Sequence, residues 1–595
     1  MGRTFAEKVF GAEAGSIVFR SPDLVLTHDN TASIRKTFEQ MNGVKVYNPS
    51  AMLVVLDHNA PPTSAKLAND YQAIRDFVKD QGIEKFYDSG KGICHQIMSY
   101  HARPGMIIVG SDSHTCTAGA FNAMAAGIDR TEAAGIWKSG ETWFRVPESI
   151  RINLTGELRE HVYAKDLSLW IIGLLGSAGA NYMSIEFHGS GVKKLSIADR
   201  MTLANLASEM GAKNAVFPPD EVLLDYFKGN LPGTPVRADE DASYAKTIHI
   251  SLNDIIPLVA APHHVDNIRP VAEVADTPVQ QGLIGTCTNG RIEDLRVAAG
   301  VLKGRKIAPG FQLHVIPASS DIYLQAAREG LVEVFIESGA NILSSSCGPC
   351  LGTGQGIPAD GVTVISTANR NFSGRMGNKN SSIYLASPAV VAWSAVYGKI
   401  TLPGSESFEG TNPFKINPSE KTEISDGSVR KKAGTWNYAD MDNLNTDQMF
   451  AGNLTYNILS SDPEAIVPHL FEGFDPQFSK HAQEGDIIIA GDNFGCGSSR
   501  EHPAVGLAHL GIKAIIVKSV NRIFYRSAIN QGLLLMVSPE AVKAFEQEGD
   551  IAIDTASGKI TCGQVGINIP PLPGKLSEIL ARKGLVNYLK EKGGK

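Results

Sequence analysis

The chain has 595 residues, of which 43% are hydrophobic and 20% charged, and its formal net charge at pH 7 is −7. A chain of this length divides into domains of about 100 to 200 residues, and we expect three or four of them. The composition is typical of a globular α/β protein. Because the net charge is negative, the protein has no overall positive potential that would bind a polyanion, and nucleic acid is not expected as a principal partner.

Seven cysteines are a low and odd count for this length. The count argues against a disulfide framework and for a reducing compartment, in which thiols stay free to bind metal. The N-terminus lacks the apolar segment of a signal peptide and the pattern of an Arg-rich transit peptide. The longest apolar runs, such as 168–175, are too short to span a bilayer. We therefore expect a cytoplasmic protein with no membrane partner.

Buried strands alternate with helices in the first part of the chain. Residues 17–28, 52–56 and 106–109 have the apolar pattern of strands, and 66–81 has the spacing of a helix. In a mostly parallel sheet the carboxyl ends of the strands face one edge, where ligand sites form. Side chains that follow these strands should therefore meet.

Polar clusters rich in histidine stand at the ends of these strands. For any single residue, a helix cap or a satisfied buried histidine is the simpler explanation. Repetition of the same pattern favours a ligand site. The clusters are His28 with Asp29, Asp57 with His58, His95 with Gln96, Asp112 to His114, and Glu186 in SIEFHG.

Three cysteines lie in a further α/β stretch, residues 273–396. Cys347 and Cys350 form a Cys-Gly-Pro-Cys turn that can present two thiolates to one ion or cluster, and Cys287 lies in a second loop, LIGTCTNG. Arg370 and Arg375 follow the next predicted strand. Two guanidinium groups beside thiolates suggest a carboxylated substrate.

Three chemistries fit this cysteine pattern. A structural zinc site normally needs a fourth protein ligand, and a redox dithiol needs no third cysteine and leaves the arginine and histidine clusters unexplained. An iron–sulfur cluster held by three cysteines leaves one iron without a protein thiolate, which would act as a Lewis acid on a hydroxyl or carboxylate. The spacing of the cysteines alone fits a zinc site and an iron–sulfur cluster about equally well. The surrounding residues favour the cluster.

Beyond residue 400 the composition changes. Residues 401–436 are rich in Pro, Gly, Ser and charge and form the clearest linker in the chain. Strands are predicted at 486–490, 514–517 and 533–537, in a separate C-terminal domain that contributes the loop GDNFGCGSSREH. Such loops can bind phosphate, but no Walker lysine follows and the Rossmann fingerprint is absent, so a nucleotide site is disfavoured.

Together these motifs resemble those of the aconitase superfamily of hydro-lyases, which carry a 4Fe–4S cluster. The matching motifs follow the family's order along nearly the whole chain: VLTHDNTA, LDHNAPP, GKGICHQ, GSDSHTCTAG, IEFHG, IGTCTNGRIEDL, SSCGPCLG, NRNFSGR, NTDQ and GDNFGCGSSREH. The resemblance implies three α/β domains around the cluster and a swivelling C-terminal domain. We accordingly expect domains 1 and 2 at 1–272, domain 3 with the cluster ligands at 273–400, a linker at 401–435 and the swivel domain at 436–595. The chain would then fuse the large and small subunits that isopropylmalate isomerases keep separate, and it would be a monomer.

The resemblance also implies roles for individual residues. Cys287, Cys347 and Cys350 would ligate the cluster. Ser498 would remove the proton next to a carboxylate, and Arg500 would stabilise the serine alkoxide. The remaining implied catalytic residues are Asp57 and His58 as the acid for the departing hydroxyl, with His95, Asp112, His114 and Glu186 around them. The implied substrate-binding residues are His28, Ser113, Asn369, Arg370, Arg375, Thr446, Asp447, Ser499 and Arg500.

The implied reaction dehydrates a small hydroxylated di- or tricarboxylate to an enoate and rehydrates the adjacent carbon. Loop 442–459, which reads the variable substituent in this family, lacks the arginine that aconitases place there for a third carboxylate. The motifs THDNTA, HTCTAGA and ETWFRVPES are more similar to those of isopropylmalate and homoaconitate enzymes. We therefore expect a malate derivative with an apolar or extended substituent. Alternative substrates are citrate or isocitrate, dimethylmalate and citramalate. Two alternatives belong to other classes of protein: an iron-responsive binding or redox-sensing protein, and a structural-zinc protein.

Overall fold

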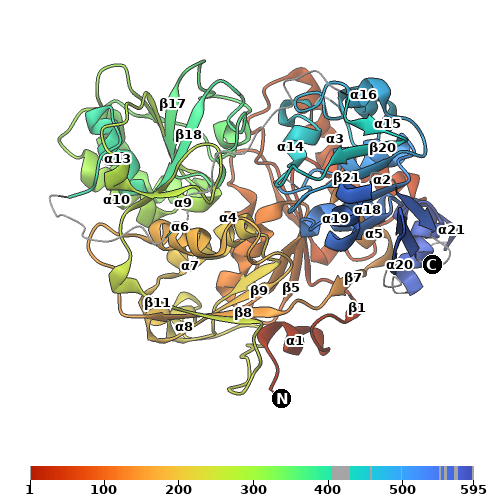
Figure 1. The fold of residues 1–595 in the computed structure, drawn as a ribbon. Helices are drawn as coiled ribbons and strands as arrows, with labels where there is room; N and C mark the ends of the chain where they lie inside the picture. Colours follow the sequence, from red (N-terminus) through yellow and green to blue (C-terminus); the bar gives the residue numbers. More distant parts are fainter. Residues whose placement is uncertain are drawn as a thin grey trace.

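The computed structural model describes residues 2–404, 414, 429–455, 458–497, 499–548, 551–554, 559–568 and 574–592. Six sheets make up this part of the chain, and the four larger ones are parallel throughout or contain mostly parallel strand pairs, with helices between their strands (Figure 1). The α/β fold class predicted from the sequence is confirmed. No helix in the described ranges combines the length and the apolarity needed to cross a bilayer.

The first sheet has five parallel strands in the order β4–β3–β2–β5–β6. The strands are β2 (Leu24–Thr27), β3 (Met52–Val55), β4 (Lys85–Tyr87), β5 (Ile107–Gly110) and β6 (Met124–Gly127), and the helices after them are α2 (Thr31–Gln40), α3 (Ala65–Gln81), α4 (Cys94–Ser99), the 3₁₀ helix η2 (Ser113–Phe121) and α5 (Arg130–Ser139). All residues of β2, β3 and β5 are buried, as expected for a parallel sheet covered on both faces. The predictions of strands at 52–56 and 106–109 and of a helix at 66–81 are confirmed.

The prediction of a single strand over 17–28 is wrong. The chain forms two strands there, β1 (Ile17–Arg20) and β2, which belong to different sheets. β1 pairs antiparallel with β7 (Thr142–Arg145), whereas β2 joins the first sheet. Pro22 lies between them, and a proline has no N–H with which to continue a ladder. The break lets His28 emerge at the carboxyl end of β2.

Two further sheets follow in the chain. The second has four parallel strands, β8 (Ser149–Thr155), β9 (Ser184–His188), β10 (Asn214–Val216) and β11 (Lys246–Ser251), with helices α6 (Ala164–Leu175) and α7 (Ile197–Leu206) between them. The third has seven strands in the order β13–β12–β18–β17–β14–β15–β16. They are β12 (Leu258–Ala260), β13 (Ile268–Pro270), β14 (Gln281–Gly285), β15 (Gln312–Ile316), β16 (Asn341–Ile342), β17 (Thr363–Ser366) and β18 (Ser382–Ala386), and the helices are α9 (Thr286–Asn289), α10 (Ile292–Leu302), α11 (Ser320–Arg328), α12 (Leu331–Ser338) and α13 (Pro388–Tyr397).

The C-terminal unit, residues 429–592 as far as they are described, has its own sheet in the order β19–β20–β21–β22–β23. Its strands are β19 (Lys431–Lys432), β20 (Thr435–Tyr438), β21 (Ile487–Ala490), β22 (Ala514–Val517) and β23 (Leu535–Val537), and its helices include α14 (Thr446–Met449), α15 (Pro463–Ile466), α16 (Phe478–His481), α17 (His502–His509), α18 (Arg522–Asn530) and α19 (Pro539–Glu548). A small antiparallel sheet of β24 (Ala552–Asp554), β25 (Lys559–Cys562) and β26 (Val565–Asn568) follows, and then α20 (Gly574–Ala581) and α21 (Leu585–Glu591). The three strands predicted in this region are confirmed.

Buried polar contacts join the C-terminal unit to the first sheet. Arg526 of α18 pairs with Glu132 of α5, with 3.0 Å between Nε and Oε2, and Asn530 donates to Asp129 at 2.7 Å. Arg522 donates to the carbonyl of Gly127 at the end of β6. In Figure 1 this unit (blue) lies on one side and β17 and β18 of the third sheet (green) on the other.

Most of the predicted linker, 405–413 and 415–428, lies outside the described residues. Within it, Phe414 is buried against Trp170 of α6, with ring centroids 5.2 Å apart. Phe414 therefore packs against a helix of the second sheet.

Candidate active site

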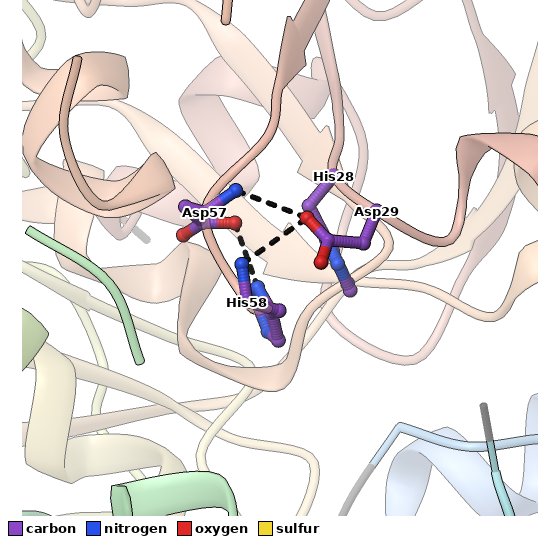
Figure 2. Close-up of side chains that lie close together, drawn as sticks. All are labelled: His28, Asp29, Asp57 and His58. Carbon is purple, nitrogen blue, oxygen red and sulfur yellow. Dashed lines mark hydrogen bonds and ion pairs between the residues drawn. The ribbon is translucent and has the colours of Figure 1, made fainter. Parts of the chain in front are cut away.

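The carboxyl edge of the first sheet gathers the predicted histidine and aspartate clusters. Asp57 and His58 follow β3, and their side chains meet with 2.7 Å between Oδ1 and Nδ1. Asp112 follows β5 and lies 2.8 Å from Nε2 of His95 and 3.5 Å from Nε2 of His58. The ring of His28, which follows β2, stacks on that of His58 with centroids 3.7 Å apart (Figure 2). The structure thus brings these five residues together, as the strand-end argument predicts.

Asp29 holds the turn that carries the Asp57–His58 pair. Its carboxylate accepts the backbone N–H groups of Asp57, His58 and Asn59 at 2.7 to 3.1 Å and the hydroxyl of Tyr71 at 2.7 Å. Figure 2 shows this carboxylate facing the turn. Ligand-type atoms of His28, Asp29, Asp57 and His58 lie within 4.8 Å of one another. Because the oxygens of Asp29 are already occupied by these donors, we assign it a positioning role and not that of a metal ligand.

Burial and the neighbouring histidine rings determine which of these aspartate and histidine side chains are charged. Burial alone would raise the pKa of Asp57, but His58 outweighs it and lowers that pKa. Burial would likewise raise the pKa of Asp112, and His95, His114 and His58 hold it well below its usual value. Burial and the neighbouring His58 lower the pKa of His28, so its ring is neutral near pH 7. Both aspartates are therefore carboxylates, and Nδ1–H of His58 donates to Asp57.

A second network joins the first sheet to the third through Glu209. Its Oε1 lies 2.7 Å from Nε2 of His114, and its Oε2 accepts from Nε of Arg370 at 3.0 Å. Arg370 also donates to the hydroxyl of Ser113 and to the carbonyl of Gly497, both at 3.0 Å. Burial would raise the pKa of Glu209, but Arg370 and His114 lower it to about 2. Arg370 is thereby fixed between three parts of the fold.

Glu186, a predicted member of the site, lies elsewhere. It falls inside β9 rather than after it, and its carboxylate accepts from the backbone of Phe5 at 3.0 Å and from the hydroxyl of Tyr244 at 3.2 Å. It lines neither of the two cavities described below. Glu209, in the short helix η4 (Ala207–Met210) after α7, holds the position beside His114 instead. No strand precedes Glu209 directly, so the strand-end pattern gave no signal for it.

The three cysteines come together from two loops of the third sheet. Cys287 lies in α9 directly after β14, and Cys347 and Cys350 lie at the short helix Gly348–Leu351. The side chain of Asn369 contacts two of the sulfurs, that of Cys287 at 3.5 Å and that of Cys350 at 3.9 Å. Burial raises the pKa of the Cys287 thiol to about 12.

Polar donors surround these sulfurs. Asn205 of α7 donates to Cys287 at 3.4 Å, and Arg375 lies 3.8 Å from the sulfur of Cys350. The backbone N–H of Cys347 donates to the carbonyl of Asp57 at 3.1 Å and links the cysteines to the first sheet. Arginine and amide N–H groups are suited to stabilising thiolates or an anionic cluster.

The C-terminal unit contributes a loop that faces the cysteines and the strand ends of the first sheet. Arg500 is buried and pairs with Asp447 of α14 at 2.6 Å, and Ser499 donates to the carbonyl of Ser111 at 3.3 Å. Ser498 lies outside the described residues. Thr446 is buried and its amide donates to the carbonyl of Cys496 at 2.9 Å, but its side chain lines neither cavity.

An inner cavity of about 50 Å³ lies where these groups converge. Side chains from the first sheet, the third sheet and the C-terminal unit all line it, including His58, Cys287 and Arg500. An outer cavity of about 340 Å³ shares Arg370 and Arg375 with it and opens between the third sheet and the C-terminal unit. The arrangement is a small polar site with thiols at one side and a wider cleft beside it.

Comparison with known proteins defines the family. A model of the aconitase family (aconitate hydratase) matches residues 4–398, and a model of the aconitase C-terminal domain matches residues 419–541. The chain therefore belongs to the aconitase family and is a hydro-lyase.

Relatives narrow the family further. The 3-isopropylmalate dehydratase large subunit 1 of Methanopyrus kandleri is 47% identical over 414 residues, which are 68% of this chain and 99% of that protein. The probable methanogen homoaconitase large subunit of Methanosarcina mazei is 47% identical over 386 residues, which are 64% of this chain and 98% of that protein. A solved structure of 3-isopropylmalate dehydratase from Methanocaldococcus jannaschii is 38% identical and covers 25% of this chain and 89% of its own, with a TM-score of 0.23. Proteins named large subunits thus match about two thirds of this chain, and the C-terminal family model matches residues 419–541, after the residues 4–398 of the first model, so both parts are joined in one polypeptide.

Proposed function

We propose that this enzyme uses a 4Fe–4S cluster to dehydrate a hydroxylated di- or tricarboxylate to an enoate and to rehydrate it at the adjacent carbon. The observation that carries the proposal is the convergence of three thiols, two carboxylate–histidine pairs and several arginines on one small cavity. Relatives named 3-isopropylmalate dehydratase and homoaconitase support this reaction.

The proposed cluster ligands are Cys287, Cys347 and Cys350. The donor set fits the group, because all three line the inner cavity, whereas none of the other described cysteines does. The raised pKa of Cys287 means that this thiol stays protonated without a cation, so ligation would release protons. Bound there, a cluster with one iron lacking a protein thiolate supplies a Lewis acid for the hydroxyl that leaves.

His58 is proposed as the acid for the departing hydroxyl. Asp57 accepts its Nδ1–H, which fixes the ring and leaves Nε2 toward Asp112 and the cavity. Asp112 also contacts His95 and the backbone N–H of His114, so the proton is shared within a hydrogen-bonded group. A proton held in such a group can be given to a leaving oxygen and later recovered from water.

Ser498 is proposed as the base that removes the proton next to a carboxylate. Its neighbours Gly497 and Ser499 contact Arg370 and Ser111, and these contacts support a location beside the inner cavity. Arg500, paired with Asp447, would stabilise the alkoxide of the serine.

Carboxylate binding is assigned to Arg370 and Arg375, with Ser113 and Asn369 beside them. Glu209 orients Arg370 from behind, so we propose Glu209 in the role that the sequence suggests for Glu186. Arg375 is buried, and apart from Cys350 its guanidinium has no described hydrogen-bonding partner within the described ranges. A substrate carboxylate would provide hydrogen-bond acceptors for the guanidinium of Arg375.

The domain division expected from the sequence is part of the proposal. The sheets of the first 400 residues would surround the cluster, and the C-terminal unit would swivel on the linker 401–435 to close the site. The buried contacts of Arg526 and Asn530 with α5 support a closed arrangement.

Anaerobic purification tests the cofactor. A brown protein whose visible absorbance bleaches in air, with about four iron atoms per chain, is the expected result. A colourless protein with stoichiometric zinc would contradict it. Dehydration of citrate, homocitrate, 3-isopropylmalate, citramalate and dimethylmalate can be followed by the ultraviolet absorbance of the enoate. A protein that carries the cluster but dehydrates none of these substrates would instead favour a sensing role.

A further inference from the structure

One buried lysine has no role in the reaction described above. Lys165 is the second residue of α6, and its exposed fraction is 0%. Lysine is rarely buried, because its ammonium group is strongly hydrated and loses that hydration in the interior. We propose that Lys165 is a buried counter-charge for the thiolates that hold the cluster, and that it fixes the loop in contact with two of them. This inference rests on the proposed function and names a group that stabilises its cofactor.

The ammonium group of Lys165 donates to backbone carbonyls. Nζ lies 2.5 Å from the carbonyl oxygen of Ala368 and 3.1 Å from that of Thr367. Within the described ranges it forms no ion pair with a carboxylate. Carbonyl oxygens accept its N–H groups without cancelling its charge, so other groups must balance a buried positive charge here.

The loop that Lys165 holds leads directly to the cysteines. Asn369 follows Ala368 in the chain, and its side chain lies 3.5 Å from the sulfur of Cys287 and 3.9 Å from that of Cys350. Lys165 itself lines neither cavity. It therefore acts through Asn369 as a positioning residue and does not touch the substrate.

Thr367 joins the same loop to the segment that carries Cys287. Its hydroxyl oxygen accepts the N–H of Gly285 at 2.9 Å, and its own N–H donates to the carbonyl of Leu283 at 2.9 Å. Gly285 directly precedes α9, in which Cys287 lies. Lys165 therefore contacts a loop that is fixed to the Cys287 segment by both backbone and side chain.

Cys287 has the greater need of a counter-charge. Arg375 lies 3.8 Å from the sulfur of Cys350. The described partners of the Cys287 sulfur are all neutral, and they are Asn205, Asn369 and Thr288. Amide and hydroxyl groups donate to a thiolate but do not cancel its charge. Lys165 provides the cation that Cys287 otherwise lacks.

Two buried carboxyl groups also act on Lys165, but both have other partners. Glu209 pairs with Arg370 at 3.0 Å. Asp166 accepts two backbone N–H groups, both at 2.9 Å. Burial raises the pKa of Asp166 to about 7, so near neutral pH this carboxyl is charged only in part. Without the cluster, the charge of Lys165 is therefore poorly balanced.

The ligated thiolates would supply the missing negative charge. Burial lowers the pKa of Lys165 to about 7. Among the groups whose negative charge opposes this lowering, Cys350 and Cys287 act more strongly than either carboxyl. As cluster ligands both sulfurs are thiolates, so the ammonium group and the ligated cysteines stabilise each other.

The first experiment compares the reduction potential of the cluster in the wild type and in Lys165→Met, which has a similar length and no charge. Reduction adds negative charge to a cluster, so removal of a nearby cation lowers the potential. The reconstituted holoenzyme is titrated with reductant and followed by electron paramagnetic resonance. The ratio of reduced to oxidised cluster at a given potential should fall about tenfold, which for one electron is a midpoint about 59 mV lower.

Lys213→Met is the matched control. Lys213 is also buried and donates to a backbone carbonyl, that of Arg145 at 2.9 Å, but it lines neither cavity. The charges that act on it most are those of Arg526 and Arg522. This substitution should leave the ratio of reduced to oxidised cluster within about twofold of the wild type, as expected for a site with no shared partner.

Lys165→Gln separates charge from hydrogen bonding, because it keeps an N–H donor for the carbonyls and removes the charge. It should lower the potential as Lys165→Met does. A wild-type potential in Lys165→Gln would show that the side chain acts through the carbonyls alone, which overturns the role as a counter-charge. An unchanged potential in Lys165→Met overturns it as well.

Cadmium binding to the cluster-free protein tests the same charge without iron. Cd²⁺ binds soft thiolates, and a complex with three of them carries negative charge. The affinity, followed by the ultraviolet absorbance of the Cd–S bonds, should be about tenfold lower or more in Lys165→Met, because a buried charge loses its partner. It should be unchanged in Lys213→Met. Equal affinities in the wild type and Lys165→Met would contradict the proposal, and this measurement also decides for a variant that does not retain the cluster.

The two proposals fail separately. A wild type that binds no iron overturns the proposed function, and the Cd²⁺ affinities then still decide whether Lys165 stabilises the thiolates. A wild type with a cluster whose potential does not respond to Lys165→Met leaves the proposed function standing and overturns the role of Lys165.

Discussion

Oε1 of Glu209 lies 2.7 Å from Nε2 of His114, although 95 residues separate them in the chain. The same carboxylate orients Arg370. One buried side chain therefore links the proposed acid–base group to the proposed carboxylate-binding group. Both should depend on it.

Glu209→Gln should lower turnover at least tenfold, because the amide neither balances Arg370 nor accepts from His114 as strongly. Glu186→Gln is a matched control, since Glu186 is also buried but lies outside both cavities. It should keep turnover within about threefold of the wild type. Rates of enoate formation check both variants, and the reverse ranking would favour Glu186 for this role.

The stability of the protein should also depend on pH through Glu209. Its pKa falls from 4.5 to about 2 on folding, which corresponds to about 3 kcal/mol. Because the folded pKa is the lower one, this contribution is fully present above pH 4.5 and is lost as the pH falls toward 2. The urea midpoint of the wild type should therefore exceed that of Glu209→Gln at pH 7, and the gap should narrow at pH 3. A gap that stays constant would mean that Glu209 is not charged in the folded protein.

Cys347→Ala should remove the visible absorbance and most of the iron, because a cluster held by three cysteines loses one of its protein ligands. Cys562→Ala is the control, since Cys562 is a buried free cysteine that lies in β25 of the C-terminal unit. Iron analysis and absorbance after anaerobic reconstitution measure the effect. Full absorbance in Cys347→Ala would contradict the ligand assignment.

Ser498→Ala should abolish turnover and leave the cluster absorbance intact, because the change removes only the proposed base. Ser499→Ala should have a smaller effect, since that hydroxyl donates to the carbonyl of Ser111. Loss of the cluster in Ser498→Ala would show that the base is misassigned.

Arg526→Met should weaken the attachment of the C-terminal unit. It leaves Glu132 buried without its partner, which costs about 3 to 5 kcal/mol. Urea denaturation followed by the fluorescence of Trp436, in the C-terminal unit, should show the loss. Arg526→Met with Glu132→Leu should regain much of it, because no buried charge is then left unpaired. No recovery in the double variant would mean that Arg526 acts through its other contacts, such as the carbonyl of Trp143.

The sequence predicted the parts of the site that depend on local rules. Strand ends of a parallel sheet meet at one edge, so the positions of His28, His58, His95 and Asp112 after predicted strands were enough to group them. The Cys-Gly-Pro-Cys turn likewise places two sulfurs together, whatever the rest of the chain does.

The tertiary structure determines the contacts that local sequence rules do not specify. Glu209 and Arg526 lie in helices, and helix propensity does not determine which neighbouring element such a side chain faces. Packing of α7 and η4 against η2 brings Glu209 to His114, and docking of the C-terminal unit on α5 brings Arg526 to Glu132. These contacts join segments far apart in the sequence, and they depend on how whole sheets pack. For that reason the Cys347–Cys350 turn could be predicted from the sequence, whereas the place of Glu209 beside His114 could not.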